Sequence, residues 1–295
     1  MNESSVARNG SEASVNLPSR EREEVRGLPR HLVDRFNREG FLLVPGVLAP
    51  EEVSRAREYL EREFDREPSH PGDHARVRFD AVTRHPELRS IFFHPKLVAS
   101  LRSILGADYV VLPECALHNA IFSTWHKDTT SQERDGHRFH WDPDYKMVEA
   151  AFYLQDNDPW FGGGLDVVPG SHVLPDKYAH PDLRTRTEQR LASRGLLPRT
   201  FSGRRGQPAY STPSRAGDLL LFHFRIDHRA TPARSSEALN LRRKLAIFLA
   251  CSSNTKHVPL YTDYLRSRPD YVYLRDHRYP DEVARLAGEA RVTLA

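Results

Sequence analysis

The order in which helical and strand-like segments follow one another most constrains the fold of this chain. Helical patterns dominate its first third, and from Tyr109 onward the apolar residues follow strand patterns. Five such segments occur: YVVLPECALHNAIFSTWHKD, KMVEAAFYLQ, GLDVVPGSH, GDLLLFHFRIDH and RRKLAIFLACSS. Because helices do not alternate with these strands, the order argues against a doubly wound parallel sheet. We predict a mainly β fold, a β-sandwich or open barrel, with flanking helices packed outside.

Helical patterns frame the strand region on both sides. Leu32, Val33 and Phe36 share one helical face, and Gly40 is expected to end that helix. The segment FLLVPGVL then predicts a strand, and Pro-Glu-Glu from Pro50 opens the next helix. Two further helices are predicted in HPKLVASLRSILG and DEVARLAGEARV.

The chain divides into a tail and one large domain. Residues 1–27 are polar and carry few large apolar groups, which predicts a disordered N-terminal tail. Residues 28–295 then form a single domain. Within it, residues 173–216 contain eight arginines and few acids, and we predict a lid insertion there. Such a lid would suit an anionic substrate, and a solvated basic surface is the alternative.

Composition excludes several classes of protein. The 295 residues carry 43 Lys and Arg against 40 Asp and Glu, and this balance does not predict a nucleic-acid partner. Cys115 and Cys251 are too few for a disulfide framework or a thiolate zinc site. No apolar run approaches the ~18 residues of a membrane span, and the N-terminus lacks the apolar segment of a secretory signal. We therefore expect a soluble cytoplasmic protein.

One short region contains the pattern histidine-any-aspartate twice. The first pair is His126 and Asp128, and the second is His140 and Asp142. A further histidine, His228, ends the strand-like run GDLLLFHFRIDH about 100 residues downstream. Alone, a strand-end histidine is more often structural. Together with one of the pairs it would complete the two-histidine, one-carboxylate set that binds Fe(II) and leaves positions free for a co-substrate and O₂.

These motifs, in this order, resemble those of the phytanoyl-CoA dioxygenase family of Fe(II)/2-oxoglutarate-dependent oxygenases. The resemblance covers roughly residues 30–255 and rests on EGFLLVPGVLAPEEV, WHKD, FYLQDND, GGGLDVVPGSH and GDLLLFHFRIDH. It implies a double-stranded β-helix of the jelly-roll or cupin-like type, with one Fe(II) chelated by 2-oxoglutarate. It also implies that O₂ converts 2-oxoglutarate to succinate and CO₂ while a C–H bond of a small organic molecule is oxidised. Hydroxylation is the expected outcome, and desaturation or ring formation remains open.

The resemblance also implies roles for individual residues. It favours His126, Asp128 and His228 as the metal ligands and catalytic centre, because the first pair closes a strand-like run. His140 and Asp142 follow a hydrophilic segment and remain the alternative pair, with a lid or substrate-pocket role if they are not ligands. Halogenating relatives replace the aspartate by a small residue, so Asp128 argues against halogenation.

The far carboxylate of 2-oxoglutarate needs a cationic partner, and arginine suits its geometry best. The family places this arginine at the start of the strand after the distal histidine, where Arg242 and Arg243 both qualify. Strand alternation would point only one inward, and Arg243 is preferred. His172 and His223 are interpreted as structural, and residues 162–164 as a glycine turn. Two other functions stay open: a non-catalytic β-helix binding or regulatory domain, and a cupin-type metal enzyme without 2-oxoglutarate.

Overall fold

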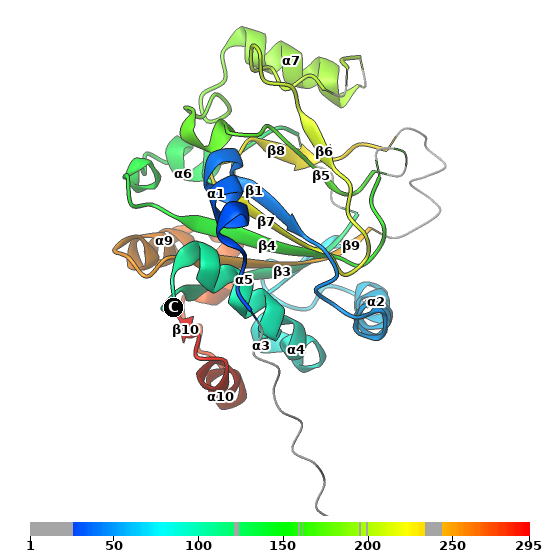
Figure 1. Ribbon diagram of the computed structural model, residues 1–295, viewed down its shortest axis with the longest axis vertical. Coiled ribbons are helices and arrows are strands. Elements are labelled where there is room, and N and C mark those ends of the chain that lie inside the picture. The colour runs from blue at the N-terminus through cyan, green and yellow to red at the C-terminus, as the bar shows by residue number, and fades with distance from the viewer. Residues whose placement is uncertain are drawn as a thin grey trace, which may run out of the picture.

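Two sheets form the centre of the molecule. The computed structural model describes residues 26–120, 124–158, 160, 162–194, 196–198, 200–233 and 244–295. The larger sheet has the order β1-β7-β4-β9-β3-β10, with β2 also paired to β3, and the smaller has the order β6-β5-β8 (Figure 1). All pairings are antiparallel except that of β10 with β3. The strands are β1 (Phe41–Val44), β2 (Val77–Phe79), β3 (Val110–Asn119), β4 (Met147–Tyr153), β5 (Leu165–Val167), β6 (Tyr210–Thr212), β7 (Leu219–His223), β8 (His228–Ala230), β9 (Leu245–Ser252) and β10 (Thr293–Leu294).

Helices cover one face of the larger sheet. In Figure 1, α2, α5 and α10 lie on one side of it, and the smaller sheet and α7 lie on the other. The α-helices are α1 (Arg30–Glu39), α2 (Pro50–Phe64), α3 (Ala81–Arg84), α4 (Arg89–Phe92), α5 (Pro95–Leu105), α6 (Thr130–Arg134), α7 (Leu183–Ser193), α9 (His257–Ser267) and α10 (Asp281–Glu289). Short 3₁₀ turns are η1 (Pro86–Leu88), η2 (Phe139–Trp141), η3 (Ser171–Val173) and η4 (Pro269–Leu274). More of the described residues lie in helices than in strands, so the expectation of a mainly β chain was too strong.

Strand alternation gives the larger sheet two different faces. On β9, Leu245, Ile247 and Leu249 pack into the main core, together with helical residues such as Leu60 and Leu101. The intervening alanine and phenylalanine side chains of β9 point the other way, toward the smaller sheet. Successive side chains of a strand point to opposite faces, so a sheet with one face under helices keeps the other face for a cavity.

Several boundaries follow from local chemistry that the sequence predicted. Gly40 ends α1 in the left-handed conformation, with φ 80°, and its N–H donates to the carbonyl of Phe36. A side chain at Gly40 would not fit, because an added Cβ would lie 2.5 Å from Nδ1 of His172. The α2 helix begins at Pro50. The carboxylate of Glu52 accepts a hydrogen bond at 2.8 Å from the backbone N–H of Ala49, the residue before the helix. These predicted helix ends are confirmed.

One predicted strand is shorter than expected. The pattern from Tyr109 to Asp128 predicted a continuous strand, but β3 ends at Asn119 and Ala120 adopts φ 52°. A positive φ at a residue with a Cβ turns the chain out of the extended region. Extended pairing resumes at His126, which forms an antiparallel bridge with His228 of β8 in the smaller sheet. Five described helices were not predicted, the longer α7 and α9 and the short α3, α4 and α6, and α9 carries a proline in its first turn.

The predicted tail and lid are described only in part. Residues 1–25 of the tail lie outside the described residues. The predicted lid, residues 173–216, contains α7 but also β6, which pairs with β5 in the smaller sheet. Within the described part of the chain, no helix combines the length and the apolar character that crossing a membrane requires.

Candidate metal centre and cavity

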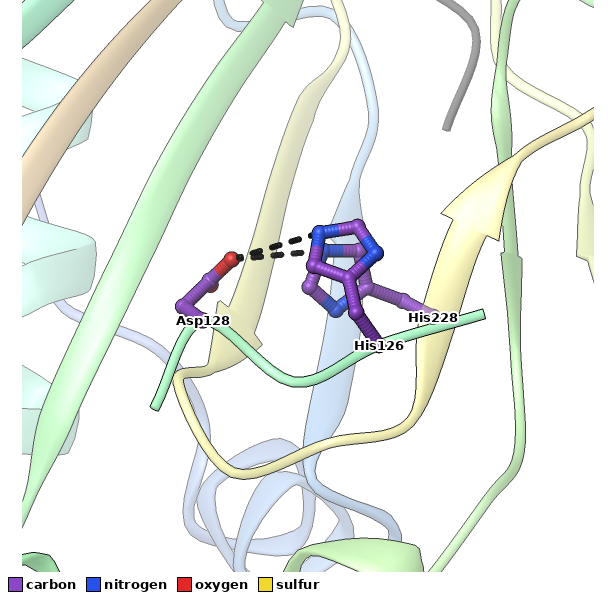
Figure 2. Close-up of side chains that lie close together, drawn as sticks. All are labelled: His126, Asp128 and His228. Carbon is purple, nitrogen blue, oxygen red and sulfur yellow. Dashed lines mark ion pairs between the residues drawn. The ribbon is translucent and has the colours of Figure 1, made fainter. Parts of the chain in front are cut away.

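Backbone pairing brings two histidines side by side. The N–H of His126 donates to the carbonyl of His228 at 3.0 Å, and the N–H of His228 donates back at 2.9 Å. Directly opposed residues of an antiparallel pair project their side chains to the same face. The two imidazole rings accordingly lie 4.2 Å apart, centroid to centroid. Asp128 stands two residues after His126 and so returns to that face, as Figure 2 shows.

The three side chains, here called the triad, converge on one point. Oδ1 of Asp128 lies 3.9 Å from Nε2 of His126 and 3.3 Å from Nε2 of His228. The Nδ1 atoms of the two histidines face backbone carbonyls, that of Thr124 at 2.7 Å and that of Ile226 at 3.1 Å. A carbonyl accepts but cannot donate, so each Nδ1 carries a proton, and Nε2 is the ring nitrogen that each histidine turns toward Asp128.

This donor set fits a divalent metal ion. Nε2 of each histidine faces the Asp128 carboxylate, and Oδ2 of Asp128 is buried without a hydrogen-bond partner. Burial lowers the pKa of His228, but the charge of Asp128 and its hydrogen bond outweigh burial and raise this pKa overall, so the two groups attract a shared positive charge. A cation at the centre would satisfy all three groups. Burial, with His228 beside it, lowers the pKa of His126 to about 4, which keeps that imidazole neutral for coordination. A two-histidine, one-carboxylate set with open positions is the geometry of non-haem Fe(II) oxygenases.

A buried ion pair joins the two segments that carry the triad. Lys127 stands between the first two members, and Asp227 directly precedes the third. Nζ of Lys127 lies 2.9 Å from Oδ1 of Asp227, and both side chains are inaccessible to solvent. Arg204 adds two hydrogen bonds to the same carboxylate, at 2.6 and 3.1 Å. The ion pair therefore links the segment that carries His126 and Asp128 to the segment that carries His228.

The alternative pair does not join this centre. His140 is fully buried, and its Nε2 lies 3.2 Å from a carboxylate oxygen of Glu133. Asp142 instead contacts His257 at 3.2 Å and Lys256 at 2.8 Å. The side chains of the second pair thus engage different partners, and neither lines the cavity described next.

A cavity of about 450 Å³ opens from the triad between the two sheets. Its wall on the larger sheet comes from the face opposite the helices and includes Phe222 and Phe248. Part of the remaining wall comes from α9 and η4, through Tyr261 and Tyr271. The volume suits a small organic molecule beside a co-substrate.

Two glutamates of the larger sheet line this cavity, Glu114 on β3 and Glu149 on β4. Glu114 follows Pro113 where the pairing of β3 with β9 shifts register, and such an irregularity re-aims a side chain. Both of its oxygens accept hydrogen bonds, from the hydroxyls of Tyr261 and Tyr271. Burial nevertheless raises its pKa. Burial likewise raises the pKa of Glu149 well above the ordinary value, and the charge of Glu114 adds to this effect.

A lysine directly before β9 lines the same cavity. Lys244 is 6% exposed and lines the cavity, and its stem passes directly over the glycine turn. A Cβ added at Gly163, which has φ 80°, would lie 2.6 Å from Cδ of Lys244. The glycine therefore lets the lysine stem cross. Arg242 and Arg243, the predicted partners of 2-oxoglutarate, lie outside the described residues.

The arginine-rich segment is placed away from the cavity. None of the described residues in 173–216 lines it, and α7 lies beyond the smaller sheet at the top of Figure 1. Arg184 is ion-paired with Glu188 at 2.8 Å, and Arg204 is engaged by Asp227. The positive groups that do line the cavity besides the lysines are Arg134 and Arg268.

Sequence reasoning did not identify Glu114, Glu149 or Lys244. The available signal was a lone charged residue inside an apolar strand, as in LPECAL and MVEAAF. Strand interiors that face a packed core rarely carry such charges, so a buried acid in them indicates a polar cavity. The histidines interpreted as structural contact the scaffold: Nε2 of His172 lies 3.1 Å from the carbonyl of Asn37, and Nδ1 of His223 accepts from a backbone N–H at 3.0 Å.

Known proteins resemble this chain in sequence and in structure. The ectoine dioxygenase of Nocardia farcinica is 29% identical over 275 residues, covering 82% of this chain and 83% of that protein. The ectoine dioxygenase of Halomonas elongata is 30% identical over 218 residues, covering 64% of this chain and 61% of that protein.

Solved structures also share the fold. HygX from Streptomyces hygroscopicus, with nickel and 2-oxoglutarate bound, aligns with a TM-score of 0.56 at 21% identity, over 77% of this chain and 88% of that one. The epimerase SnoN, in complex with Fe³⁺, alpha ketoglutarate and nogalamycin RO, aligns with a TM-score of 0.54 at 21% identity, over 76% and 83%. The family model described as Phytanoyl-CoA dioxygenase (PhyH) matches residues 36–243. The chain therefore belongs to the phytanoyl-CoA dioxygenase family, and it is an Fe(II)- and 2-oxoglutarate-dependent dioxygenase that acts on a small molecule.

Proposed function

We propose that His126, Asp128 and His228 bind the Fe(II) and that the enzyme hydroxylates its substrate in the adjoining cavity. The observation that carries this proposal is the convergence of three metal-binding acceptors, one of them a buried carboxylate oxygen without a hydrogen-bond partner. When bound, Fe(II) and 2-oxoglutarate supply the oxidising chemistry, in which O₂ is consumed, succinate and CO₂ are released and an oxygen atom is transferred to the substrate.

The scaffold's part is to orient the reactants and exclude water. We propose that the two facing sheets correspond to a double-stranded β-helix, with the triad on the smaller sheet and the substrate wall on the larger. The backbone pairing of His126 with His228 and the buried Lys127–Asp227 ion pair support a rigid metal site. A carbonyl partner on each Nδ1 holds both imidazoles in the tautomer that a metal needs.

The far carboxylate of 2-oxoglutarate needs a cationic partner. We propose that the segment leading into β9 supplies it. The sequence names Arg243 first and Arg242 second, and the burial of Lys244 in the cavity wall adds a third candidate. Alanine at the true anchor is expected to raise the KM for 2-oxoglutarate strongly, because an unpaired desolvated carboxylate costs roughly 2–5 kcal/mol. The three single variants, compared by succinate release, identify which residue it is.

An anionic group on the substrate, expected from the arginine-rich segment, would be met at the cavity by Arg134 and Arg268 instead. Both line the cavity, whereas the described residues of 173–216 do not. Substitution of either arginine by glutamine is then expected to raise the KM for the substrate, while neutralisation of the α7 arginines leaves it unchanged.

The metal assignment has a direct test. Fe(II) and 2-oxoglutarate, added together without O₂, are expected to give a weak visible charge-transfer band with the wild-type protein. His126→Ala, Asp128→Ala and His228→Ala should lose this band and the activity, because each removes one of three protein ligands. His140→Ala is the matched control and should retain both. A protein in which His140→Ala loses the band and His126→Ala keeps it would bind iron at the second pair.

The reaction type is tested by isotope labelling. With ¹⁸O₂, hydroxylation places one labelled atom in succinate and one in the product, whereas desaturation or ring formation leaves the product unlabelled. A non-catalytic binding domain would show the band without any succinate release, and a cupin-type enzyme would turn over without 2-oxoglutarate.

A further inference from the structure

The most unusual group in the cavity wall is Glu149. It is 9% exposed and lines the cavity from the middle of β4. Its neighbours on the adjacent strands are Phe222 on β7 and Ala250 on β9, neither of which offers a polar side chain. Among the described residues, none donates a hydrogen bond to the Glu149 carboxyl group or forms an ion pair with it.

Glu149 is largely buried and has no partner among the described residues, so its carboxyl group depends on what occupies the cavity, and its presence requires an explanation. Removing a carboxylate from water without a compensating hydrogen bond or cation is strongly unfavourable. Fold stability alone does not explain the residue, because an alanine or a leucine would suit the apolar neighbours better. Groups of this kind are maintained at sites where a ligand completes their interactions.

A second carboxyl group reinforces the negative character of the same wall. Glu114 is held in place by the hydroxyls of Tyr261 and Tyr271, and burial raises the pKa of both phenols, so both remain donors. No ion pair joins Glu114 or Glu149 to a lysine or arginine in the part of the chain that the structure describes. Arg268 also lines the cavity, but its guanidinium is ion-paired with Asp270 at 3.0 Å and donates to the hydroxyl of Tyr264.

The surroundings of these carboxyl groups also suit a cation. Phe222, Phe224 and Phe248 line the same cavity, together with the two tyrosines that hold Glu114. Aromatic faces attract ammonium and guanidinium groups, and more so where water is excluded. Apolar walls around two carboxylates would also discriminate against a hydrated metal ion, which retains its water.

We propose that the cavity receives a substrate bearing a cationic nitrogen group, such as an ammonium, an amidinium or a guanidinium, and that Glu149 binds this group with Glu114 beside it. The inference rests on the proposed function, because it names the substrate class of that same site. Lys244, in contrast, provides a positive charge in the cavity wall, which suits a carboxylate. The cavity wall therefore offers carboxyl groups to the cationic group of the substrate and a lysine to the anionic co-substrate, while an anionic group elsewhere on the same substrate would still be met by Arg134 and Arg268.

Binding of matched probe pairs tests this proposal without turnover. Benzamidine and benzamide share a shape and differ in charge, as do cyclohexylmethylamine and cyclohexylmethanol. Calorimetric titrations at pH 8 into the protein loaded with Zn²⁺ and 2-oxoglutarate are expected to show at least ten-fold tighter binding of the cation in at least one pair. Glu149→Gln keeps the side-chain shape and removes the charge, so it should abolish that preference. Glu149→Asp, which keeps the charge, should retain part of it.

Glu58→Gln on the exposed face of α2 is the matched control and should bind the probes as the wild type does. Circular dichroism and the Fe(II)–2-oxoglutarate band confirm that each variant is folded and loaded, which separates failure of this proposal from failure of the proposed metal site. Equal binding of cation and neutral probe by the wild type in both pairs would overturn the proposal. An unchanged preference in Glu149→Gln would do so as well.

Discussion

The buried ion pair of Lys127 allows a quantitative prediction of how much it contributes to the stability of the fold and to metal affinity. Its ammonium group lies 2.9 Å from Asp227 in a region inaccessible to solvent. It also donates to the carbonyl of Ser171 at 2.7 Å and to that of Arg225. Lys127→Met keeps most of the side-chain volume and removes the charge, so its effect isolates the ion pair and these two hydrogen bonds.

The magnitude follows from the geometry. At 2.9 Å and an effective dielectric constant of about 20, the direct attraction is roughly 6 kcal/mol before desolvation is subtracted. Removing one partner of a buried pair typically costs about 3–5 kcal/mol. Because Arg204 still binds Asp227 through two hydrogen bonds, we expect the lower end of this range, about 3 kcal/mol in the free energy of unfolding. The metal affinity should also fall, roughly 10- to 100-fold, because the two triad segments lose their connection.

Urea unfolding followed by tryptophan fluorescence measures the first quantity, and titration with a divalent metal measures the second. Lys256→Met is the matched control, because Lys256 lies 2.8 Å from Asp142 but is 62% exposed. Solvent screens such a pair, so the control should unfold and bind metal much as the wild type does. A Lys127→Met protein with wild-type stability and metal affinity would refute the reasoning.

Three further outcomes are expected. Gly163→Ala should raise the KM for 2-oxoglutarate and lower stability by roughly 1–3 kcal/mol, because the new Cβ meets the Lys244 stem and φ is 80°; steady-state kinetics and urea unfolding measure the two effects. Burial lowers the pKa of His85 from 6.5 to about 4, so about 3 kcal/mol of stability, present above pH 6.5, should be lost as the pH falls toward 4. His85→Gln should flatten this slope in urea titrations while keeping a hydrogen bond to Tyr59, and an unchanged slope would contradict the assignment. For Glu149, burial raises the pKa above 4.5, so the wild type should lose stability relative to Glu149→Gln as the pH rises from 5 to 8; a constant difference in melting temperature would argue against a buried, unpartnered acid.

Much of the secondary structure followed from local patterns in the chain. Glycine after an amphipathic stretch predicted the end of α1, Pro-Glu-Glu predicted the start of α2, and strand-like apolar runs predicted β4 and β9. These features depend on residues close together in sequence, so propensity and capping were sufficient to predict them. The proportion of helix was underestimated, because α7 has few apolar residues and a proline lies near the start of α9.

The candidate site divides in the same way. The sequence by itself supplied the chemical types, two histidines, an aspartate and basic residues before β9, and with them the family. Only the tertiary structure decided that His126 rather than His140 lies beside His228, since this depends on a backbone pairing across about 100 residues. It also decided that Glu114 and Glu149 share one cavity. The sequence of a strand does not show whether its carboxyl group faces solvent or a cavity, because the pairing of distant strands determines which groups lie against each face of the sheet.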